Sequence, residues 1–322
     1  MTLADKFRER FGVQFKEHES LTRHVNIRIG GPALWFIEAR NTQDLIDAVN
    51  MAQSVAVEYF ILGGGSNTLV ADTGFAGLVI KAANRAVRIE GDRMFVEAGA
   101  ISSAVARASA DAGLRGFEWA VSLPGTIGGA VRGNAGCFGA EMKDSVELVR
   151  VFRRGEILSL SNADLHFAYR HSLLKENDND DVVLDVVLKL TIGDRTEASA
   201  QIEKMLAGRK ATQPLGASSA GCMFKNFEWS DHAQIAQLQK IIDVPQECIE
   251  RKRIPAGWII EKLGLKGLSV GDAEVSPQHG NFLLNKGHAT AEDILSLVTK
   301  VKKQVSNETG ILLEEEVVHI GF

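Results

Sequence analysis

The segment SLPGTIGGAVRGNAGCFG, residues 122–139, constrains the fold more than any other part of the chain. Glycine occupies positions 125, 128, 129, 133, 136 and 139, and each glycine costs conformational entropy on folding. Pro124 fixes the start of the segment and Thr126 is placed to cap a helical turn. Gly128 and Gly129 would leave the amides of that turn open to an anion. Close main-chain packing inside a domain is the alternative explanation, and the two are compatible.

A second glycine cluster follows the apolar run VEYFIL, which predicts a buried strand over 57–62. The turn residues are Gly63, Gly64, Gly65, Ser66 and Asn67. They match neither the dinucleotide fingerprint GxGxxG nor a Walker loop, which needs a lysine followed by Ser or Thr. Successive glycine amides can still form an anion nest, and Ser66 and Asn67 add side-chain donors. An ordinary glycine-rich turn remains the alternative.

Length and composition set the class of protein. The chain has 322 residues, so two or three domains are expected, and 45% hydrophobic with 24% charged residues describes a soluble globular protein. No apolar run approaches the roughly 18 residues of a membrane helix, and the first residues lack a secretory signal. We therefore expect a cytoplasmic protein without membrane insertion. A net charge of -5 without a basic block gives no reason to expect nucleic acid.

The three cysteines, Cys137, Cys222 and Cys248, are odd in number and far apart. This spacing favours neither a disulfide framework nor a CxxC metal knuckle, and we expect no metal. Cys222 lies in the small-residue stretch SAGCMFKN. Core filler, nucleophile and proton donor all remain open for this thiol at this point.

Periodicity gives the remaining elements. Helices are expected over about 102–112, after Ala198, and from Thr290 to Gly310, the last with a capping pattern and apolar residues at helical spacing. From Ala198 the chain becomes helix-rich, which indicates a second module. The ending ILLEEEVVHIGF predicts a strand that places Glu314, Glu316, Val318 and Ile320 on one face. A carboxylate on that face is either a candidate acid or a strand end that emerges into solvent.

Six motifs occur in a fixed order: GGGSN, LPGTIGGAVRGNAG, HFAYRHS, RKATQPLGASSAGCMFKN, AGWIIEKLGLKG and LEEEVVHIG. In this order, from about Thr22 to the C-terminus, the chain resembles the UDP-N-acetylenolpyruvoylglucosamine reductases, the MurB flavoenzymes of peptidoglycan precursor synthesis. The resemblance implies an α+β fold: a two-subdomain FAD-binding domain of the vanillyl-alcohol-oxidase type and a smaller α+β substrate domain. The boundaries it implies are 1–80 and 81–196 for the two subdomains, with the strand 311–322 joining the first, and 197–310 for the substrate domain.

The resemblance also implies the reaction and the partners. NADPH would reduce FAD, and the reduced flavin would pass hydride to the vinyl carbon of the enolpyruvyl ether on UDP-N-acetylglucosamine, giving UDP-N-acetylmuramate. The partners are then small molecules, and we expect a cytoplasmic monomer. FAD would lie along the two glycine clusters, where the implied contacts are Gly63, Gly64, Gly65, Ser66, Asn67, Ser122, Pro124, Gly125, Thr126, Gly128, Gly129, Asn134, Ala135 and Gly136.

By position in the motifs, three residues would be catalytic. Arg170 of YRHS would bind the substrate carboxylate, and Glu316 would act as a carboxyl near the same oxygens. Cys222 stands where the family usually has the serine that donates a proton to the intermediate. A thiol, with an ordinary pKa of about 8.5, is mostly protonated at neutral pH and can fill that role. The substrate-binding residues implied in the same way are Gln213, Asn226, Lys266 and His279.

The chain departs from the family pattern at several places. Phe227 replaces the proline that commonly follows FKN, the segment 228–253 is longer than in compact members, and the tyrosine-bearing flap of the longer subclass is absent. Two other functions remain open. One is a sugar or lactone oxidase on the same flavin fold, and the other is a non-catalytic protein that binds FAD or a UDP-sugar.

Overall fold

The computed structural model describes residues 2–176, 181–214, 216–231 and 233–322, and it divides into two compact units. Unit 1 comprises Met1–Glu19, Pro32–Gly65 and Phe75–Ala211; unit 2 comprises Ser20–Gly31, Ser66–Gly74 and Thr212–Phe322. The chain therefore enters unit 2 twice before its last third. The expected boundaries at 80 and 196 and the expected substrate domain 197–310 stay predictions; in the two compact units, residues 311–322 fall together with Ser66–Gly74 in unit 2.

The first sheet of unit 1 has the strand order β1-β2-β5-β3, and β2 and β3 both pair with β5 in parallel. Parallel strands need a crossover connection, and helix α2 connects β2 to β3 on the other side of β5. Aliphatic residues of α2 and β5 and the phenylalanines of α1 form one buried core. The predicted strand over 57–62 is confirmed as β3. The bounds are α1 Leu3–Phe11, β1 Phe15–Ser20, β2 Pro32–Ala39, α2 Thr42–Ser54, β3 Tyr59–Leu62 and β5 Phe75–Ala82.

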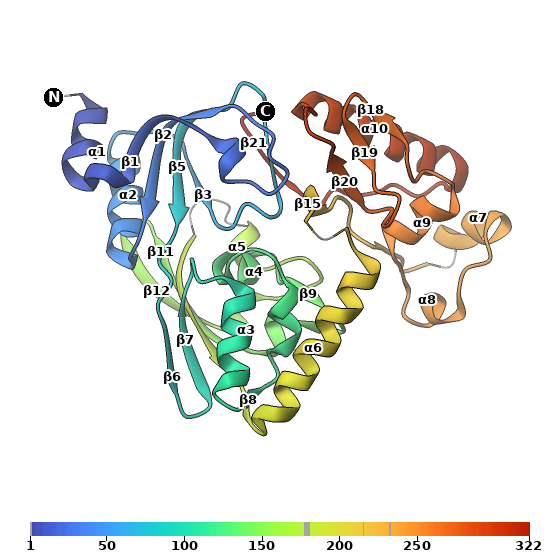
Figure 1. The fold of residues 1–322 in the computed structure, drawn as a ribbon, viewed down its shortest axis with the longest axis horizontal. Coiled ribbons are helices and arrows are strands. Elements are labelled where there is room, and N and C mark those ends of the chain that lie inside the picture. The colour runs from blue at the N-terminus through green and yellow to red at the C-terminus, as the bar shows by residue number, and fades with distance from the viewer. Residues whose placement is uncertain (1, 177–180, 215, 232) are drawn as a thin grey trace. The chain divides into compact units, whose positions relative to one another are not determined.

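The second sheet of unit 1 is antiparallel, with the order β12-β11-β13-β7-β6. Figure 1 labels four of its strands, β12, β11, β7 and β6. In β11 the buried Val149 and Val151 flank the exposed Arg150, as expected for a strand with one face on a core. The helix expected over 102–112 is confirmed as α3. The strands are β6 Val87–Glu90, β7 Arg93–Glu97, β8 Leu114–Arg115, β9 Gly136–Cys137, β10 Ala140–Glu141, β11 Val146–Arg153, β12 Glu156–Ser161, β13 Val182–Lys189 and β14 Thr191–Ile192; the helices are α3 Ser102–Asp111, α4 Ile127–Arg132, α5 Leu173–Glu176 and α6 Arg195–Thr212.

Unit 2 is built on a sheet with the order β15-β20-β19-β18, and helix α10 packs on β18 and β19. Helix α10 begins and ends as predicted: Thr290 and Asp293 form a capping box, and Gly310 closes it in the left-handed conformation. The bounds are β4 Thr68–Val70, β15 Ser218–Cys222, β16 Phe227–Glu228, α7 Ala233–Ile241, α8 Gln246–Glu250, β17 Arg253–Ile254, α9 Ala256–Lys262, β18 Ser269–Val270, β19 Ala273–Val275, β20 Phe282–Asn285, α10 Ala291–Thr309 and β21 Val318–Ile320.

The predicted C-terminal strand is shorter than its alternation suggests. Only Val318–Ile320 forms β21, which pairs in parallel with β4. Residues 314–316 make a single bridge to Phe224 instead, so no continuous ladder fixes their alternation. The side chain of Glu314 is 73% exposed, and the prediction that it shares one strand face with Ile320 is wrong.

The described residues contain neither a membrane-spanning helix nor a metal-binding cluster. None of their helices is both long and apolar enough to cross a membrane. No three histidine, cysteine or acidic side chains among them lie close enough together to hold a metal ion.

Candidate active site

The two glycine clusters meet in unit 1. A Cβ added to Gly64 would lie 2.6 Å from the Cα of Gly125, and one added to Gly63 would lie 2.6 Å from Thr126 Oγ1. Gly65 and Gly125 both have positive φ, at 63° and 102°. Glycine is therefore required here by close approach and by conformation. The result is a close main-chain contact between two segments that are far apart in the sequence.

Part of the second cluster has a different role from the one predicted. Thr126 precedes helix α4 but makes no side-chain cap hydrogen bond. The first two amides of α4 are used in packing, because Ile127 N–H donates to Ala100 O and Gly128 N–H donates to Ala98 O, both at 2.9 Å. A Cβ at Gly128 would lie 2.9 Å from Ala98 Cβ. The prediction that these amides face an anion is wrong, and close packing explains Gly128.

The turn that carries Arg170 is tied to the end of the second cluster. Asn134 is fully buried, and its Nδ2 donates to Ala168 O at 2.9 Å and to Glu141 Oε2 at 2.8 Å. Its Oδ1 accepts from Lys143 N–H at 3.0 Å. The side chain of Asn134 is thus committed to holding the loop, so a cofactor contact from Asn134 would come from its main chain.

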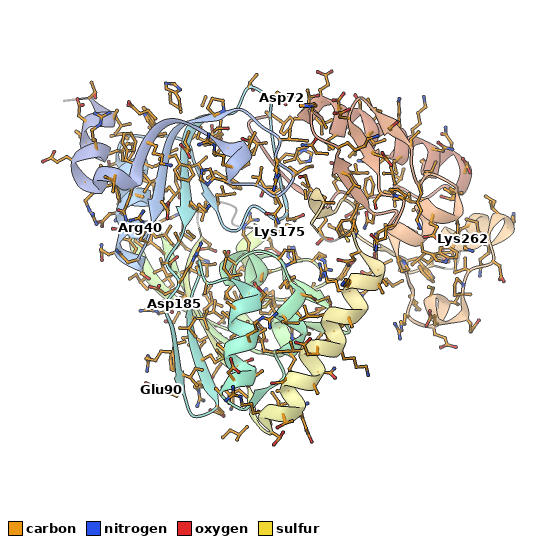
Figure 2. The ribbon with its side chains drawn as sticks, in the orientation of Figure 1. Arg40, Asp72, Glu90, Lys175, Asp185 and Lys262 are labelled. Carbon is orange, nitrogen blue, oxygen red and sulfur yellow. The ribbon has the colours of Figure 1, made fainter. Side chains whose placement is uncertain are left out.

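Arg170 itself is in a strained conformation. Its φ is +55°, in the left-handed region that arginine rarely adopts, between the paired residues Ala168 and His171. Nη2 donates to Gly136 O at 3.2 Å, and Nζ of Lys175, labelled in Figure 2, donates to Arg170 O at 3.3 Å. Strain of this kind persists only where surrounding contacts hold it, and it clusters at functional sites.

A second guanidinium lies at the same loops. Arg209, near the end of α6, donates from Nη1 to Ser122 Oγ at 3.2 Å. The neighbouring thiol of Cys137 lies 3.4 Å from Trp119 O. Burial raises the pKa of Cys137, while Arg209, Ser122 and Arg170 oppose that rise. Cys137 is therefore a partly buried thiol whose pKa stays raised despite the positive charges of Arg209 and Arg170.

Unit 2 brings Cys222 and Glu316 onto adjacent segments. Glu316 N–H donates to Met223 O at 2.8 Å, and Lys225 N–H donates to Glu314 O at 2.8 Å. Asn67 joins the same group, since its Nδ2 donates to Glu316 O at 2.9 Å. Gly221, with a φ of +79°, lies beside the main chain of Ser66.

Ion pairs occupy the other glutamates of this segment. Lys225 Nζ lies 2.9 Å from Glu314 Oε2, and Lys302 Nζ lies 3.0 Å from Glu315 Oε1. His319 Nε2 lies 3.2 Å from the second oxygen of Glu315. Glu314 and Glu315 thus have cationic or potentially cationic neighbours of their own.

Three predicted substrate-binding residues surround helix α9, which begins the AGWIIEK motif. Asn226 Oδ1 accepts from Ala256 N–H at 3.3 Å, and Lys266 Nζ lies 2.5 Å from Glu261 Oε2. A Cβ at Gly257 would lie 3.0 Å from Cε1 of His279, so the absence of a side chain makes room for that ring. Gln213, the fourth predicted substrate-binding residue, is half-buried near the start of Thr212–Phe322, the last segment of unit 2.

Comparisons with known proteins match both units. Residues 213–320 fit the model for the C-terminal domain of UDP-N-acetylenolpyruvoylglucosamine reductase, and residues 33–161 fit that of an FAD binding domain. The chain is 37% identical over 331 residues to the reductase of Desulfosudis oleivorans, covering 99% of this chain and 97% of that one. It is 36% identical over 309 residues to the reductase of Caldanaerobacter subterraneus subsp. tengcongensis, covering 94% and 93%.

The crystal structure of the reductase from Thermus caldophilus superposes with a TM-score of 0.75 at 32% identity, covering 95% of this chain and 98% of that chain. The chain belongs to the UDP-N-acetylenolpyruvoylglucosamine reductase family. It is an FAD-dependent oxidoreductase of that family, and the expected fold class, α+β with an FAD-binding domain, is confirmed.

The residues present fit the cofactor of this reductase family. FAD links a flat ring system to adenosine through a diphosphate, and the half-buried Gly63, Gly64 and Gly125 offer main chain without side chains to such a ligand. Arg209 and Arg170 place positive charge around the same loops of unit 1.

The geometry supports some predicted groupings and leaves others open. Cys222 and Glu316 lie together in unit 2, whereas Arg170 belongs to unit 1. The sequence analysis did not single out Arg209 and Gly257, which lie within quoted motifs, or Asn281, which lies outside them. Their roles depend on contacts between segments that are distant in the sequence. Of the three, only Gly257 carries a local signal, because a glycine inside an apolar helical motif suggests close packing against a neighbour.

Proposed function

We propose that the protein reduces the enolpyruvyl ether of UDP-N-acetylglucosamine to UDP-N-acetylmuramate, with NADPH as the reductant. The relatives' names supply the substrate class. The observation that carries the proposal is the hydrogen bond from Glu316 N–H to Met223 O at 2.8 Å. It sets a carboxyl and a thiol, both suited to proton chemistry, on adjacent segments in the module that matches the reductase C-terminal domain.

When bound, FAD would supply the hydride-transfer chemistry between NADPH and the vinyl carbon of the substrate. Residues of the first glycine cluster would bind its phosphates through main-chain amides. Ser122 and Pro124 would border it, together with main-chain groups of the second cluster. The proposed contacts are Gly63, Gly64, Gly65, Ser66, Asn67, Ser122, Pro124, Gly125, Thr126, Gly129, Asn134, Ala135 and Gly136.

Arg170 would bind the carboxylate of the enolpyruvyl group through its planar guanidinium. Hydride addition to the alkene moves an electron pair toward the carbon that bears this carboxylate, and negative charge grows on its oxygens. A guanidinium stabilises that charge more strongly as it develops, which is how binding becomes catalysis. The strained turn and its link to Gly136 support a guanidinium that is already oriented before substrate binds.

Cys222 would complete the reduction. The Sγ–H bond breaks, its proton forms the new C–H bond at the carbon beside the carboxylate, and the resulting thiolate recovers a proton from water. Glu316 would assist as a carboxyl near the substrate oxygens. Because a thiol is a stronger acid than an alcohol, the replacement of the family's usual serine is compatible with this step.

The residues around α9 would bind the UDP-sugar. Nδ1 of His279 accepts from Asn281 N–H at 3.2 Å, so the neutral ring carries its proton on Nε2 and can donate from there. We assign Asn226 and Lys266 to the diphosphate and Gln213 with His279 to the rest of the substrate. Lys266, paired with Glu261, would exchange that carboxylate for a phosphate oxygen.

We further propose that the protein acts as a cytoplasmic monomer. One chain supplies Arg170, Cys222 and Glu316, so the site needs no residue from a second copy. Light scattering after gel filtration tests the monomer, and fractionation of cells tests the location.

Anaerobic absorption spectroscopy tests the reaction. The flavin band of the purified protein should bleach with NADPH and return when the enolpyruvyl substrate is added. Cys222→Ala should slow the return by about 100-fold without slowing the bleaching, whereas Cys222→Ser should stay within about tenfold of the parent. Return of the band with oxygen alone at a catalytic rate would favour an oxidase. Binding without any turnover would favour a non-catalytic protein.

A further inference from the structure

The ladder between β15 and β20 ends at the predicted proton donor. Cys222 lies opposite Phe282, and the register shifts between Ser219 and Cys222. Gly221, in the left-handed region, makes that shift possible. The following residues, Met223 and Phe224, run beyond the first residue of β20 and are nearly fully buried, at 1% exposure each. Their main-chain groups therefore need partners from elsewhere.

Asn281 supplies those partners. Its main-chain carbonyl accepts from Met223 N–H at 2.8 Å, and its side-chain Oδ1 accepts from Phe224 N–H at 2.9 Å. Its Nδ2 donates to Phe224 O at 2.8 Å. The side-chain amide thus pairs with Phe224 as the main chain of a neighbouring strand would. The successive main-chain amides of Met223 and Phe224 therefore both donate to Asn281, the first to its carbonyl and the second to its side chain.

The opposite edge of this segment carries the predicted carboxyl. Met223 O accepts from Glu316 N–H, and Lys225 N–H donates to Glu314 O, both at 2.8 Å. The segment that follows Cys222 is therefore held between Asn281 on one edge and residues 314–316 on the other. A displacement of Asn281 would therefore move the segment that follows Cys222 relative to residues 314–316.

Asn281 also holds His279. Asn281 N–H donates to Nδ1 of His279, and the side chain of the same asparagine binds the main chain of Phe224. Asn281 is only 2% exposed. Because it is buried and its amide is used on Phe224, it acts through its neighbours and does not itself need to touch substrate.

We propose that Asn281 is a positioning residue: it fixes the backbone after Cys222 so that the thiol delivers its proton to the substrate carbon. This inference rests on the proposed function. Fixing the amides of Met223 and Phe224 restricts the dihedral angles that set the direction of the Cys222 side chain. Displacement of a reacting group by about 1 Å can cost about 100-fold in rate, so a support two residues away matters to the chemistry.

The variant Asn281→Asp tests this by pH. As a carboxylate the new side chain cannot donate to Phe224 O, but as a carboxylic acid it can. We expect return of the flavin band on addition of substrate to be about 100-fold slower than in the parent at pH 8, and to recover as the pH falls toward 6. Bleaching by NADPH should be unchanged, and the solvent deuterium isotope effect on the return should rise. The titratable neighbours His279, Lys225 and Glu314 to Glu316 are common to the parent, whose own pH profile is the reference.

The matched control is Asn285→Asp. Asn285 also lies in β20, and its amide also holds main chain, donating to Ile27 O at 3.1 Å and accepting from Gly287 N–H at 2.8 Å. Its side chain bonds the main chain of Ile27 and Gly287, not the segment after Cys222, so both half-reactions should proceed at the parent rate. Asn281→Ser, which keeps a shorter donor, is measured if the aspartate variant fails to retain FAD.

The outcomes separate this role from the proposed function. A parent flavin that is not reoxidised by substrate would overturn the function itself. If Cys222→Ala reoxidises at the parent rate, the thiol is not the donor and Asn281 has no thiol to position. If Cys222→Ala is slow but the Asn281 variant reoxidises normally at pH 8, slows both half-reactions equally, or matches Asn285→Asp, the positioning role alone is wrong.

Discussion

Asn67 Nδ2 donates to the main-chain carbonyl of Glu316 at 2.9 Å, and Asn67 O accepts from Val318 N–H at 3.0 Å. The last residue of the first glycine cluster is therefore bonded to the segment that carries the predicted catalytic carboxyl. The two residues are 249 positions apart in the sequence. A loop proposed to bind cofactor phosphates through its main chain thus uses its asparagine side chain to hold Glu316.

Asn67→Ala should separate these two uses. Loss of the Nδ2 donor leaves Glu316 O without this bond, which costs about 1 kcal/mol and loosens the carboxyl. We expect flavin reoxidation by substrate to slow about tenfold, while the dissociation constant of FAD, measured by fluorescence titration, should change less than threefold. Weaker FAD binding with normal reoxidation of the FAD-saturated variant would instead assign the side chain to the cofactor.

Arg170→Lys should show whether the planar guanidinium is needed. Lysine keeps the charge but offers no fork of donors to a carboxylate, and it loses the Nη2 bond to Gly136 O. We expect kcat to fall about 100-fold and NADPH oxidation by the flavin to be unaffected. Stopped-flow measurement of each half-reaction checks this. Arg107→Lys, at an exposed position of α3 in the same unit, is the control and should match the parent.

The sequence predicted the parts of this fold whose signals are local. Helix α10 follows from Thr290, Asp293 and Gly310, which are close in sequence and act on one helix. The meeting of Gly64 with Gly125 needed tertiary contact, although both clusters were recognised from composition.

The side-chain roles of the buried asparagines were harder to predict. Asn134, Asn67 and Asn281 each hold main chain from a distant segment. Nothing in the residues adjacent to an asparagine reveals which distant carbonyl it will contact. For the same reason Gly128 was assigned to an anion site when its neighbour is Ala98.

Cys137 should make the stability of unit 1 depend on alkaline pH. Burial raises the pKa of its thiol above the ordinary value. The unfolded chain then ionises first as pH rises and binds fewer protons than the folded chain, so the free energy of unfolding should fall as the pH passes about 9. Urea unfolding at pH 7.5 and 9.5 measures this fall, and Cys137→Ala should reduce it.

Cys248 supplies the internal comparison for that measurement. Burial also raises its pKa, and it lies in unit 2. Cys248→Ala should also reduce the fall in the free energy of unfolding between pH 7.5 and 9.5. The Cys137→Ala/Cys248→Ala double variant should show a smaller fall than either single variant. An undiminished fall in Cys137→Ala would show that its thiol does not sense folding.

Asp72 should be the most sensitive carboxylate for the stability of unit 2 outside the candidate site (Figure 2). Its Oδ1 and Oδ2 accept from Ala291 N–H at 2.9 and 3.0 Å, and Oδ2 accepts from Glu292 N–H at 3.3 Å. A negative charge here satisfies amides that the first turn of α10 leaves open and favours the positive end of the helix dipole. The capping box of Thr290 serves a different amide, that of Asp293, so it cannot replace these bonds.

Asp72→Ala should therefore lower the free energy of unfolding by about 1 to 2 kcal/mol, measured in urea. Asp111→Ala, which breaks an exposed pair with Arg195, should cost less than about 0.5 kcal/mol. Equal losses in the two variants would mean that Asp72 contributes no more than a surface charge. Unit 2 also carries Cys222 and Glu316, but the Asp72 carboxylate bonds the start of α10, so the folded fraction of Asp72→Ala should still reoxidise flavin at the parent rate.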